Sequence, residues 1–197
     1  MDLTRIAPPQ PYAALIFDCD GTLADTMPTH FAAWTAALRS LSADITEKRF
    51  YELGGVPSAA IIEILNAENG YTLDVGRTVE EKERRYVEGL HQAQEIKAVV
   101  DVARAHQGKV PMAVASGGLR HIVTRTLDML GLTALFDTVV TADDVLRGKP
   151  APDIFLLAAE RLGVAPEDCV VYEDGEPGIL AARAAGMRVV DVRVLWE

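Results

Sequence analysis

Five short runs rich in Val, Ile, Ala and Met recur along this chain, at residues 13–18, 110–116, 138–141, 169–173 and 188–192. A run that is apolar at nearly every position is typical of a strand buried on both faces, and such strands occur in parallel sheets. Helical patterns separate the last four runs and end near glycine, as αβ connections commonly do. Because right-handed crossovers place such helices on both faces, the pattern predicts an α/β fold with a Rossmann-like, doubly wound parallel sheet.

The segment between the first two runs breaks this alternation. Residues 27–94 show apolar residues at helical spacing and contain no convincing strand. We therefore predict an all-helical cap domain at 27–94, inserted into a catalytic core domain formed by 1–26 and 95–197. Such an insertion would lie above the carboxyl end of the first strand, where ligands bind in open α/β sheets. The helices expected in the cap cover residues 29–40, 46–53, 58–69 and 79–93, and those expected in the core cover 97–108, 119–130, 152–162 and 178–185.

The charge of the chain argues against two classes of partner. The 197 residues carry a formal net charge of −10, which opposes binding to nucleic acid and to anionic membranes. The first residues, Met1 to Tyr12, are polar and resemble neither a signal peptide nor a membrane span. We therefore expect a cytoplasmic protein, a monomer that binds a small molecule. If that molecule is an anion, the site needs a bound cation or well-placed basic groups.

Two carboxylates stand where the first predicted strand ends. The chain reads Asp18-Cys19-Asp20-Gly21 at this point. A lone Asp-Gly is more commonly an ordinary turn, in which the aspartate bonds its own backbone. Here, however, a buried strand delivers both acids to the ligand-binding edge of the sheet, and close carboxylates repel each other unless a proton or cation intervenes. Hard oxygen ligands of this kind suit Mg²⁺.

The ends of the next three strands add complementary groups. Ser116 and Gly117 offer a hydroxyl and backbone N–H groups at a helix start, which suit phosphate but also suit a simple helix N-cap. Lys149 lies between Gly148 and Pro150; a lone lysine is usually a solvated surface group. Glu173 and Asp174 end the fourth run, where a solvent-facing turn is the alternative. Because all these strand ends meet at one edge of a parallel sheet, we expect their side chains to share one crevice.

These residues, in this order, resemble the four sequence motifs of the haloacid dehalogenase superfamily. The match covers nearly the whole chain. The segment 178–187 and the helical insertion resemble the β-phosphoglucomutase-like branch of that superfamily. Segments 28–30 and 155–159 are similar to bacterial fructose-1-phosphate phosphatases of the YqaB type.

The resemblance implies a phosphatase that works through a covalent intermediate. Asp18 would attack phosphorus to form an aspartyl phosphate, and Asp20 would act as acid toward the leaving alkoxide and then as base for water. Mg²⁺ would be held by the side chains of Asp18 and Asp174, by the backbone carbonyl of Asp20 and, through water, by Glu173. The ion would offset the repulsion between two anions.

The phosphoryl oxygens would be held by the remaining motif residues. The resemblance assigns this role to the Ser116 hydroxyl, the Gly117 N–H and the Lys149 ammonium, which would also balance Asp18.

In the predicted cap, His30 and Lys82 match substrate-side residues of the same branch. The alternatives are a packing histidine and a solvated lysine, and the sequence leaves both open. After Leu53, where mutases of this branch carry a basic loop, this chain reads Gly-Gly-Val-Pro-Ser over residues 54–58. Because a mutase must grip a second phosphate and exclude water, this difference favours hydrolysis.

Three other functions are compatible with parts of this pattern. A β-phosphoglucomutase-like phosphosugar mutase is the alternative within the same class. A receiver-like module, which is phosphorylated on aspartate but is not an enzyme, is disfavoured by the large insertion and by Asp20. Halide removal is disfavoured because the paired acids suit phosphoryl transfer. We expect a small sugar phosphate, with fructose 1-phosphate as the first candidate.

Overall fold

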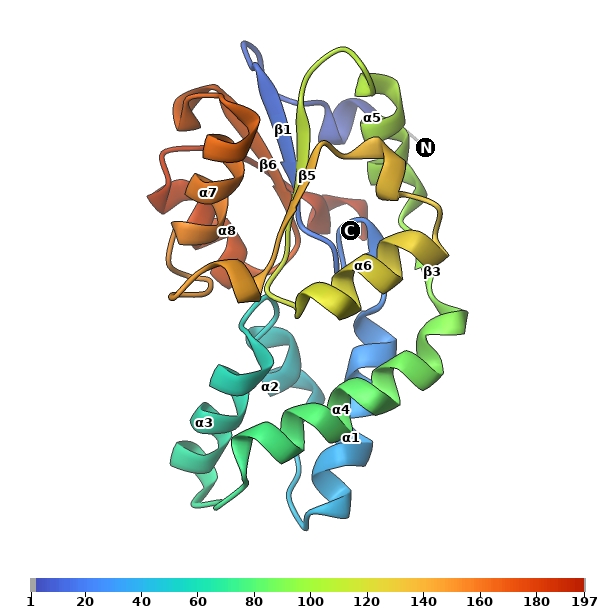
Figure 1. The fold of residues 1–197 in the computed structure, drawn as a ribbon, viewed down its shortest axis with the longest axis vertical. Helices are drawn as coiled ribbons and strands as arrows, with labels where there is room; N and C mark the ends of the chain where they lie inside the picture. Colours follow the sequence, from blue (N-terminus) through green and yellow to red (C-terminus); the bar gives the residue numbers. More distant parts are fainter. Residues whose placement is uncertain (1–2, 197) are drawn as a thin grey trace.

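A five-stranded parallel sheet forms the centre of the larger lobe in the computed structural model, which describes residues 3–196 (Figure 1). The strands run in the order β5-β4-β1-β6-β7, and every neighbouring pair is parallel. The chain builds one half of the sheet beside β1 and then crosses to build the other half. This confirms the predicted doubly wound α/β fold. The strands are β1 (Ala14–Phe17), β4 (Met112–Ala115), β5 (Thr138–Val140), β6 (Cys169–Glu173) and β7 (Arg188–Asp191).

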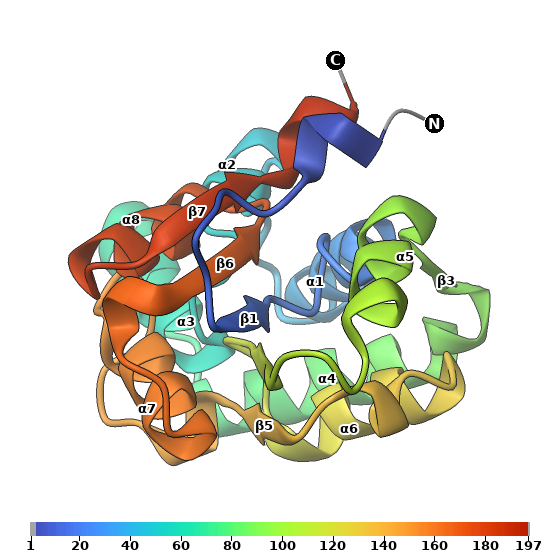
Figure 2. The ribbon, with the colours of Figure 1, turned by 90° about the horizontal axis from the view of Figure 1, so that it is seen from above.

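Alternate side chains of the strands feed two separate cores, one on each face of the sheet. Leu15 and Phe17 of β1 belong to one core, and Ala14 and Ile16 belong to the other. The strands are apolar at every position because both of their faces are buried. Figure 2 shows the helices that cover the two faces on opposite sides of the sheet. They are α5 (Lys97–His106) and α6 (Arg120–Met129) on one face, and α7 (Asp153–Leu162) and α8 (Glu176–Ala184) on the other.

Short 3-10 helices tie the two ends of the described chain together. η1 (Leu3–Ile6) packs against η6 (Val192–Leu195), and the Tyr172 hydroxyl donates a 2.8 Å hydrogen bond to the Ile6 carbonyl. Residues 1–2 and 197 of the predicted core domain lie outside the described residues. No helix within residues 3–196 combines the length and the apolar character that a membrane crossing requires.

The second lobe consists of helices that follow the first strand (Figure 1). Their buried side chains include Trp34, Phe50 and Ile62, and form a core of their own. The last of these helices begins and ends four residues earlier than the prediction of 79–93. Asp74 caps it by accepting a 2.7 Å hydrogen bond from the Arg77 N–H, a start signal that the apolar spacing does not contain. The helices are α1 (Met27–Ser40), α2 (Glu47–Glu52), α3 (Ser58–Asn69) and α4 (Val75–Gly89), followed by η2 (Leu90–Gln92).

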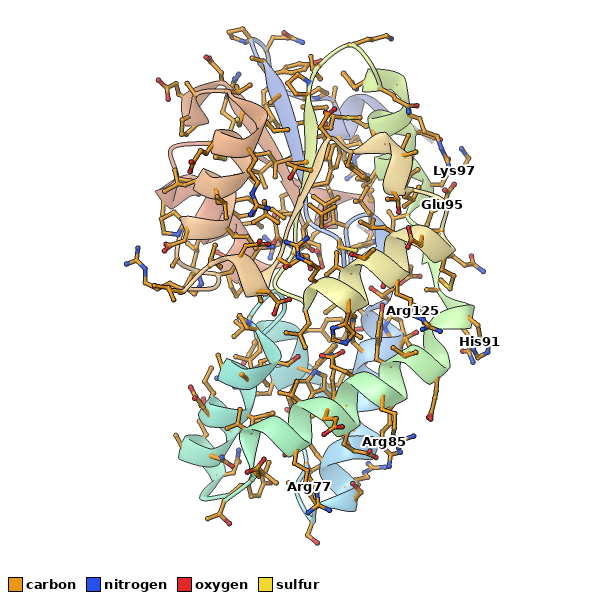
Figure 3. The ribbon with its side chains drawn as sticks, viewed as in Figure 1. Arg77, Arg85, His91, Glu95, Lys97 and Arg125 are labelled. Carbon is orange, nitrogen blue, oxygen red and sulfur yellow. The ribbon has the colours of Figure 1, made fainter. Side chains whose placement is uncertain are left out.

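A two-stranded antiparallel ribbon, which the sequence did not predict, joins the two lobes. β2 (Ala24–Asp25) pairs with β3 (Gln94–Glu95) where the chain leaves the sheet and where it returns. Figure 3 labels Glu95 on the returning segment. Arg104 of α5 donates hydrogen bonds of 3.0 and 2.7 Å to the two oxygens of Glu95, and so attaches the ribbon to the core. We propose this ribbon as the boundary between the cap, residues 27–94, and the core.

Candidate active site

The carboxyl end of the central strand carries a buried ion-pair cluster. Asp18 directly follows β1 and is 4% exposed, and Glu173 is the last residue of the neighbouring β6. The Lys149 ammonium donates to both, at 2.6 Å to Asp18 Oδ1 and 2.7 Å to Glu173 Oε1. Lys149 is itself 2% exposed, so the solvated surface lysine considered as an alternative is wrong. Charges buried this deeply remain ionised only when they are paired.

A third acid, Asp174, completes a candidate metal centre. Carboxylate oxygens of Asp18, Glu173 and Asp174 lie within 4.8 Å of one another. The Thr22 hydroxyl orients Asp174 by donating a 2.8 Å hydrogen bond to its Oδ1. Three carboxylates therefore share one nearby ammonium group, that of Lys149.

The pKa values of this cluster show that positive charge is in short supply. Burial raises the pKa of Asp18 to about 7 in spite of Lys149, and Glu173 adds to the rise. Burial, together with the charges of Glu173 and Asp18, also raises the pKa of Asp174 well above its ordinary value. At Lys149, burial would lower the pKa, but Asp18 and Glu173 outweigh burial and raise it, which favours the charged ammonium. A divalent cation would relieve this imbalance, and the hard oxygen donors fit Mg²⁺.

Asp20 contacts the first helix of the cap. Its Oδ1 accepts a 2.6 Å hydrogen bond from the Thr26 hydroxyl and lies 3.0 Å from His30 Nε2 of α1. Burial opposes ionisation of Asp20, but His30, Thr26 and the charge of Lys82 outweigh it and lower the pKa to about 2. Asp20 is therefore held as a carboxylate in a fixed orientation.

The turn after β4 faces the same cavity. Ser116 is buried, and its hydroxyl accepts a 3.1 Å hydrogen bond from the Gly118 N–H. The N-cap of α6 is Leu119, so the alternative in which Ser116 merely caps this helix is wrong. Ser116 and Gly117 line a cavity together with Asp18 and Asp20. Its volume is about 70 Å³, several times the roughly 10–15 Å³ that one water molecule needs.

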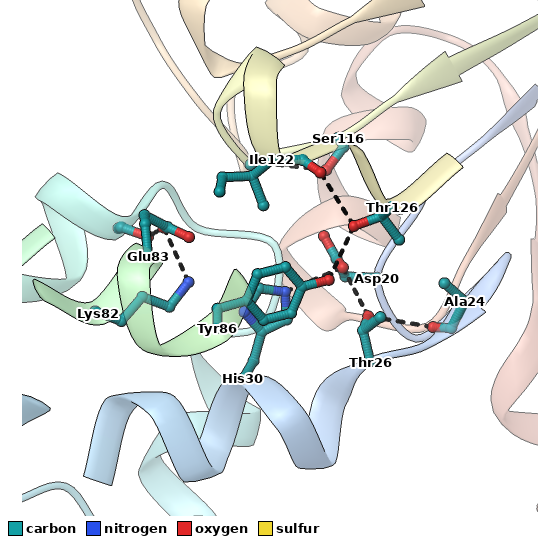
Figure 4. Close-up of polar contacts among 12 residues, drawn as sticks. Asp20, Ala24, Thr26, His30, Lys82, Glu83, Tyr86, Ser116, Ile122 and Thr126 are labelled. Carbon is teal, nitrogen blue, oxygen red and sulfur yellow. Dashed lines mark hydrogen bonds and ion pairs between the residues drawn. The ribbon is translucent and has the colours of Figure 1, made fainter. Parts of the chain in front are cut away.

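The cap supplies the opposite wall of this cavity, as Figure 4 shows. The His30 ring is stacked on Tyr86, with ring centroids 3.9 Å apart. Lys82 is 3% exposed, and its ammonium lies 5.6 Å from the centre of the Trp34 ring. The alternative of a solvated Lys82 is therefore wrong. Because His30 also contacts Asp20, its position is not that of a histidine that only packs.

The cap loop between α2 and α3 lies directly against the core. A methyl group added at Gly117 would collide with the Gly55 carbonyl oxygen, and one added at Gly148 would collide with the Pro57 ring. Glycine at these two positions thus lets the backbone of the cap approach the loops that carry Ser116 and Lys149. The cap is closed over the site in this conformation.

Sequence reasoning missed three residues that organise this site. Thr22 and Thr26 orient Asp174 and Asp20, and both are fully buried. Glu83 of α4 lines the cavity beside Lys82. Glu83 could have been identified from its helical spacing, because it lies on the face of α4 that also carries the buried residues Thr78 and Tyr86. A charged residue on a buried face requires a partner.

Comparisons with known proteins agree with this geometry. A family model described as haloacid dehalogenase-like hydrolase matches residues 12–186. Fructose-1-phosphate phosphatase YqaB of Escherichia coli is 44% identical over 184 residues, which cover 93% of this chain and 98% of that protein. β-Phosphoglucomutase of Bacillus subtilis is 30% identical over 190 residues, covering 91% and 82%. The crystal structure of a hydrolase from Pseudomonas syringae superposes with a TM-score of 0.83 at 29% identity, covering 90% and 83%.

The fold and the site define a capped α/β enzyme. Its acid cluster lies at the carboxyl ends of β1 and β6, where the chain changes from building one half of the sheet to building the other. The chain belongs to the haloacid dehalogenase-like hydrolase family. The family predicted from the four motifs, its β-phosphoglucomutase-like relatives and the assignment as a hydrolase are thereby confirmed.

Proposed function

We propose that the protein is a Mg²⁺-dependent phosphatase that hydrolyses a small sugar phosphate such as fructose 1-phosphate. The observation that carries the proposal is the convergence of three carboxylates within 4.8 Å of one another around Lys149, beneath a closed cap. The similarity to YqaB over nearly the full length of both chains supports the class of substrate. The similarity to β-phosphoglucomutase supports a phosphorylated sugar more broadly.

The metal is assigned to the oxygen donors at the sheet edge. Asp18 and Asp174 would hold Mg²⁺ by their side chains, with the Asp20 backbone carbonyl and, through water, Glu173 completing the protein ligands. When bound, the ion supplies positive charge that offsets the repulsion between the nucleophile and an anionic phosphoryl group. Lys149 holds Asp18 at 2.6 Å and limits its motion.

Hydrolysis then proceeds in two displacements at phosphorus. An Asp18 oxygen forms a bond to phosphorus as the bond to the sugar oxygen breaks. Asp20, which is ionised in the substrate-free site and takes up a proton as the substrate binds, delivers that proton to the leaving oxygen. Asp20 next takes a proton from water, whose oxygen attacks the aspartyl phosphate, releases inorganic phosphate and regenerates the Asp18 carboxylate. Ser116, the Gly117 N–H and Lys149 stabilise the phosphoryl oxygens in both steps.

Asp20 is well placed for these proton transfers. Thr26 and His30 hold one of its oxygens, at 2.6 and 3.0 Å, so the carboxylate keeps one orientation in both half-reactions.

In the substrate pocket of the cap, Lys82 and His30 contact the sugar.

The reaction is tested by measuring phosphate release from a panel of sugar phosphates, with Mg²⁺ and with chelator. Fructose 1-phosphate is the first substrate to try. We expect Mg²⁺-dependent release without any sugar bisphosphate activator. Isomerised sugar phosphate with little phosphate release would instead identify a phosphosugar mutase. Phosphorylation of the chain without turnover of any ester would indicate a receiver-like module.

We further propose that the enzyme acts in the cytoplasm as a monomer on a small molecule, without nucleic acid or membrane as partner. The catalytic groups named above are all residues of this chain, which supports the proposal of a monomer. Its net charge of −10 disfavours polyanionic partners.

A further inference from the structure

Glu83 is a buried carboxylate that the proposed mechanism does not use. It lies on α4, is 6% exposed and lines the cavity that also contains Asp18 and Asp20. Figure 4 shows it on α4 next to Lys82, near His30 and Tyr86. A carboxylate that is buried in this way needs bonding partners, because removing a charge from water costs free energy that only such partners offset.

Within the described part of the chain, only one of the two Glu83 oxygens has hydrogen-bond partners. Oε1 accepts hydrogen bonds from the Lys82 ammonium at 2.9 Å and from the Ser58 hydroxyl at 3.0 Å. These two donors come from α4 and from the start of α3, so they fix the orientation of the carboxylate. Oε2 is buried and has no hydrogen-bond partner within the described residues 3–196. A buried acceptor left unpaired is costly, and the site recovers this cost when a bound molecule brings a donor.

The charge on this side of the cavity is balanced. Lys82 is the only lysine or arginine among the described lining residues, and it is paired with Glu83. The other cap residues around this pair are mostly apolar, Trp34, Phe50 and Ile61 among them. A second phosphate here would find no unpaired lysine or arginine and would face the Glu83 carboxylate, whereas a neutral hydroxyl would find a free acceptor.

We propose that Glu83 is a specificity residue, whose Oε2 accepts a hydrogen bond from a hydroxyl on the carbon chain of the substrate and excludes substrates with a second anionic group at that end. The inference rests on the proposed phosphatase function and narrows it. The substrate class is a polyhydroxylated phosphomonoester whose far end is neutral. Apolar esters lack the donor, and bisphosphates carry the wrong charge.

The test compares three esters in the Mg²⁺-loaded enzyme. They are fructose 1-phosphate, fructose 1,6-bisphosphate and p-nitrophenyl phosphate. The last of these has no hydroxyl on its organic group. In Glu83→Gln, kcat/KM for fructose 1-phosphate should fall by about 10- to 100-fold, the effect of weakening a hydrogen bond to a charged group. The value for p-nitrophenyl phosphate should change by less than about threefold, because no contact to that ester is lost. The preference for the monophosphate over the bisphosphate should shrink by about tenfold or more.

Two further variants separate specificity from folding. Glu80→Gln makes the same chemical change at an exposed position of the same helix and should alter none of the three rates. Glu83→Asp keeps the negative charge but shortens the side chain by one methylene, so the carboxylate oxygen no longer reaches the substrate hydroxyl. This variant should lose turnover of fructose 1-phosphate and still reject the bisphosphate. If Glu83→Gln fails to fold, Glu83→Asp decides the question.

Equal losses on fructose 1-phosphate and p-nitrophenyl phosphate would overturn the inference, because they would show a structural role only. Unchanged rates in both Glu83 variants would overturn it as well. In either case an active wild-type enzyme would leave the phosphatase function standing. A wild-type protein that releases phosphate from none of the esters would overturn the phosphatase function and this inference together.

Discussion

The Lys149 ammonium lies 2.6 Å from Asp18 Oδ1, although 131 residues separate the two in the sequence. Glu173 binds the same ammonium at 2.7 Å, so Lys149 keeps a partner when Asp18 is neutralised. The first prediction follows from this arrangement. In Asp18→Asn the fold should persist, but phosphate release should fall by about 10³-fold or more, because an amide cannot replace the carboxylate nucleophile.

Asp168→Asn is the matched control for this variant. Asp168 is exposed and directly precedes β6, at the end of the sheet away from the site, and its replacement should leave the rate unchanged. Release of phosphate is followed by a colorimetric assay, and folding by the thermal unfolding curve. Turnover retained in pure Asp18→Asn protein would exclude Asp18 as the nucleophile.

The second prediction concerns closure of the cap. Gly148 faces the Pro57 ring of the cap loop so closely that a Cβ would collide with it. Gly148→Ala should therefore hold the cap partly open, lower kcat/KM for fructose 1-phosphate by about tenfold and increase the radius of gyration measured by small-angle X-ray scattering. In Gly76→Ala, the added Cβ would have Asp74 Oδ1 as its nearest neighbour, at 3.7 Å, and nothing should change. A Gly148→Ala enzyme with wild-type kinetics would show that the contact is dispensable.

The sheet and its acid cluster could be predicted because their signals are local. Residues 14–17 are buried on both faces, and a strand of that kind is apolar throughout. The residue that follows each parallel strand reaches the same edge, so Asp18, Ser116 and Asp174 could be brought together before any coordinates were known.

The connecting ribbon and the cap wall could not be predicted in the same way. β2 and β3 are each two residues long, which is too short for a period to show, and they pair across about 70 residues. The start of α4 depends on the cap made by Asp74, not on an apolar repeat. Glu83 and Lys82 are charged and so resemble surface residues in sequence. Lys82 was predicted only through the family resemblance, and the packing of α4 against α1 and α3 is what buries both side chains.

The third prediction concerns Asp144, a structural acid that is not among the residues lining the catalytic cavity. Asp144 accepts hydrogen bonds from the Thr141 N–H at 2.8 Å and from Arg161 at 2.9 Å, and it also contacts Arg120. Burial opposes its ionisation, but Arg161, Thr141 and Arg120 outweigh burial and lower the pKa of Asp144. Asp144→Asn should reduce the free energy of unfolding by about 1–2 kcal/mol at neutral pH.

The sign of the pH dependence follows from that lowered pKa. A carboxyl group that is more acidic in the folded state stabilises the protein above its unfolded pKa, near 3.8, and loses this effect as the pH falls. The difference between wild type and Asp144→Asn should therefore be constant from about pH 6 to 8 and shrink below about pH 4. Urea unfolding at several pH values measures it. A difference that grows on acidification would contradict the assignment.

The last prediction addresses the metal without using activity. Asp18, Glu173 and Asp174 crowd three carboxylates around one ammonium, so binding of Mg²⁺ to the folded state should raise the melting temperature. At a concentration about 100 times the Kd, the stabilisation is about 2.7 kcal/mol, equivalent to roughly 5–10 °C for a domain of this size. In Asp174→Asn the metal-free protein should melt no lower than wild type, because one repelling charge is gone, and added Mg²⁺ should have little effect. Differential scanning calorimetry with Mg²⁺ or chelator measures both proteins, and an equal rise in the two would place the ion elsewhere.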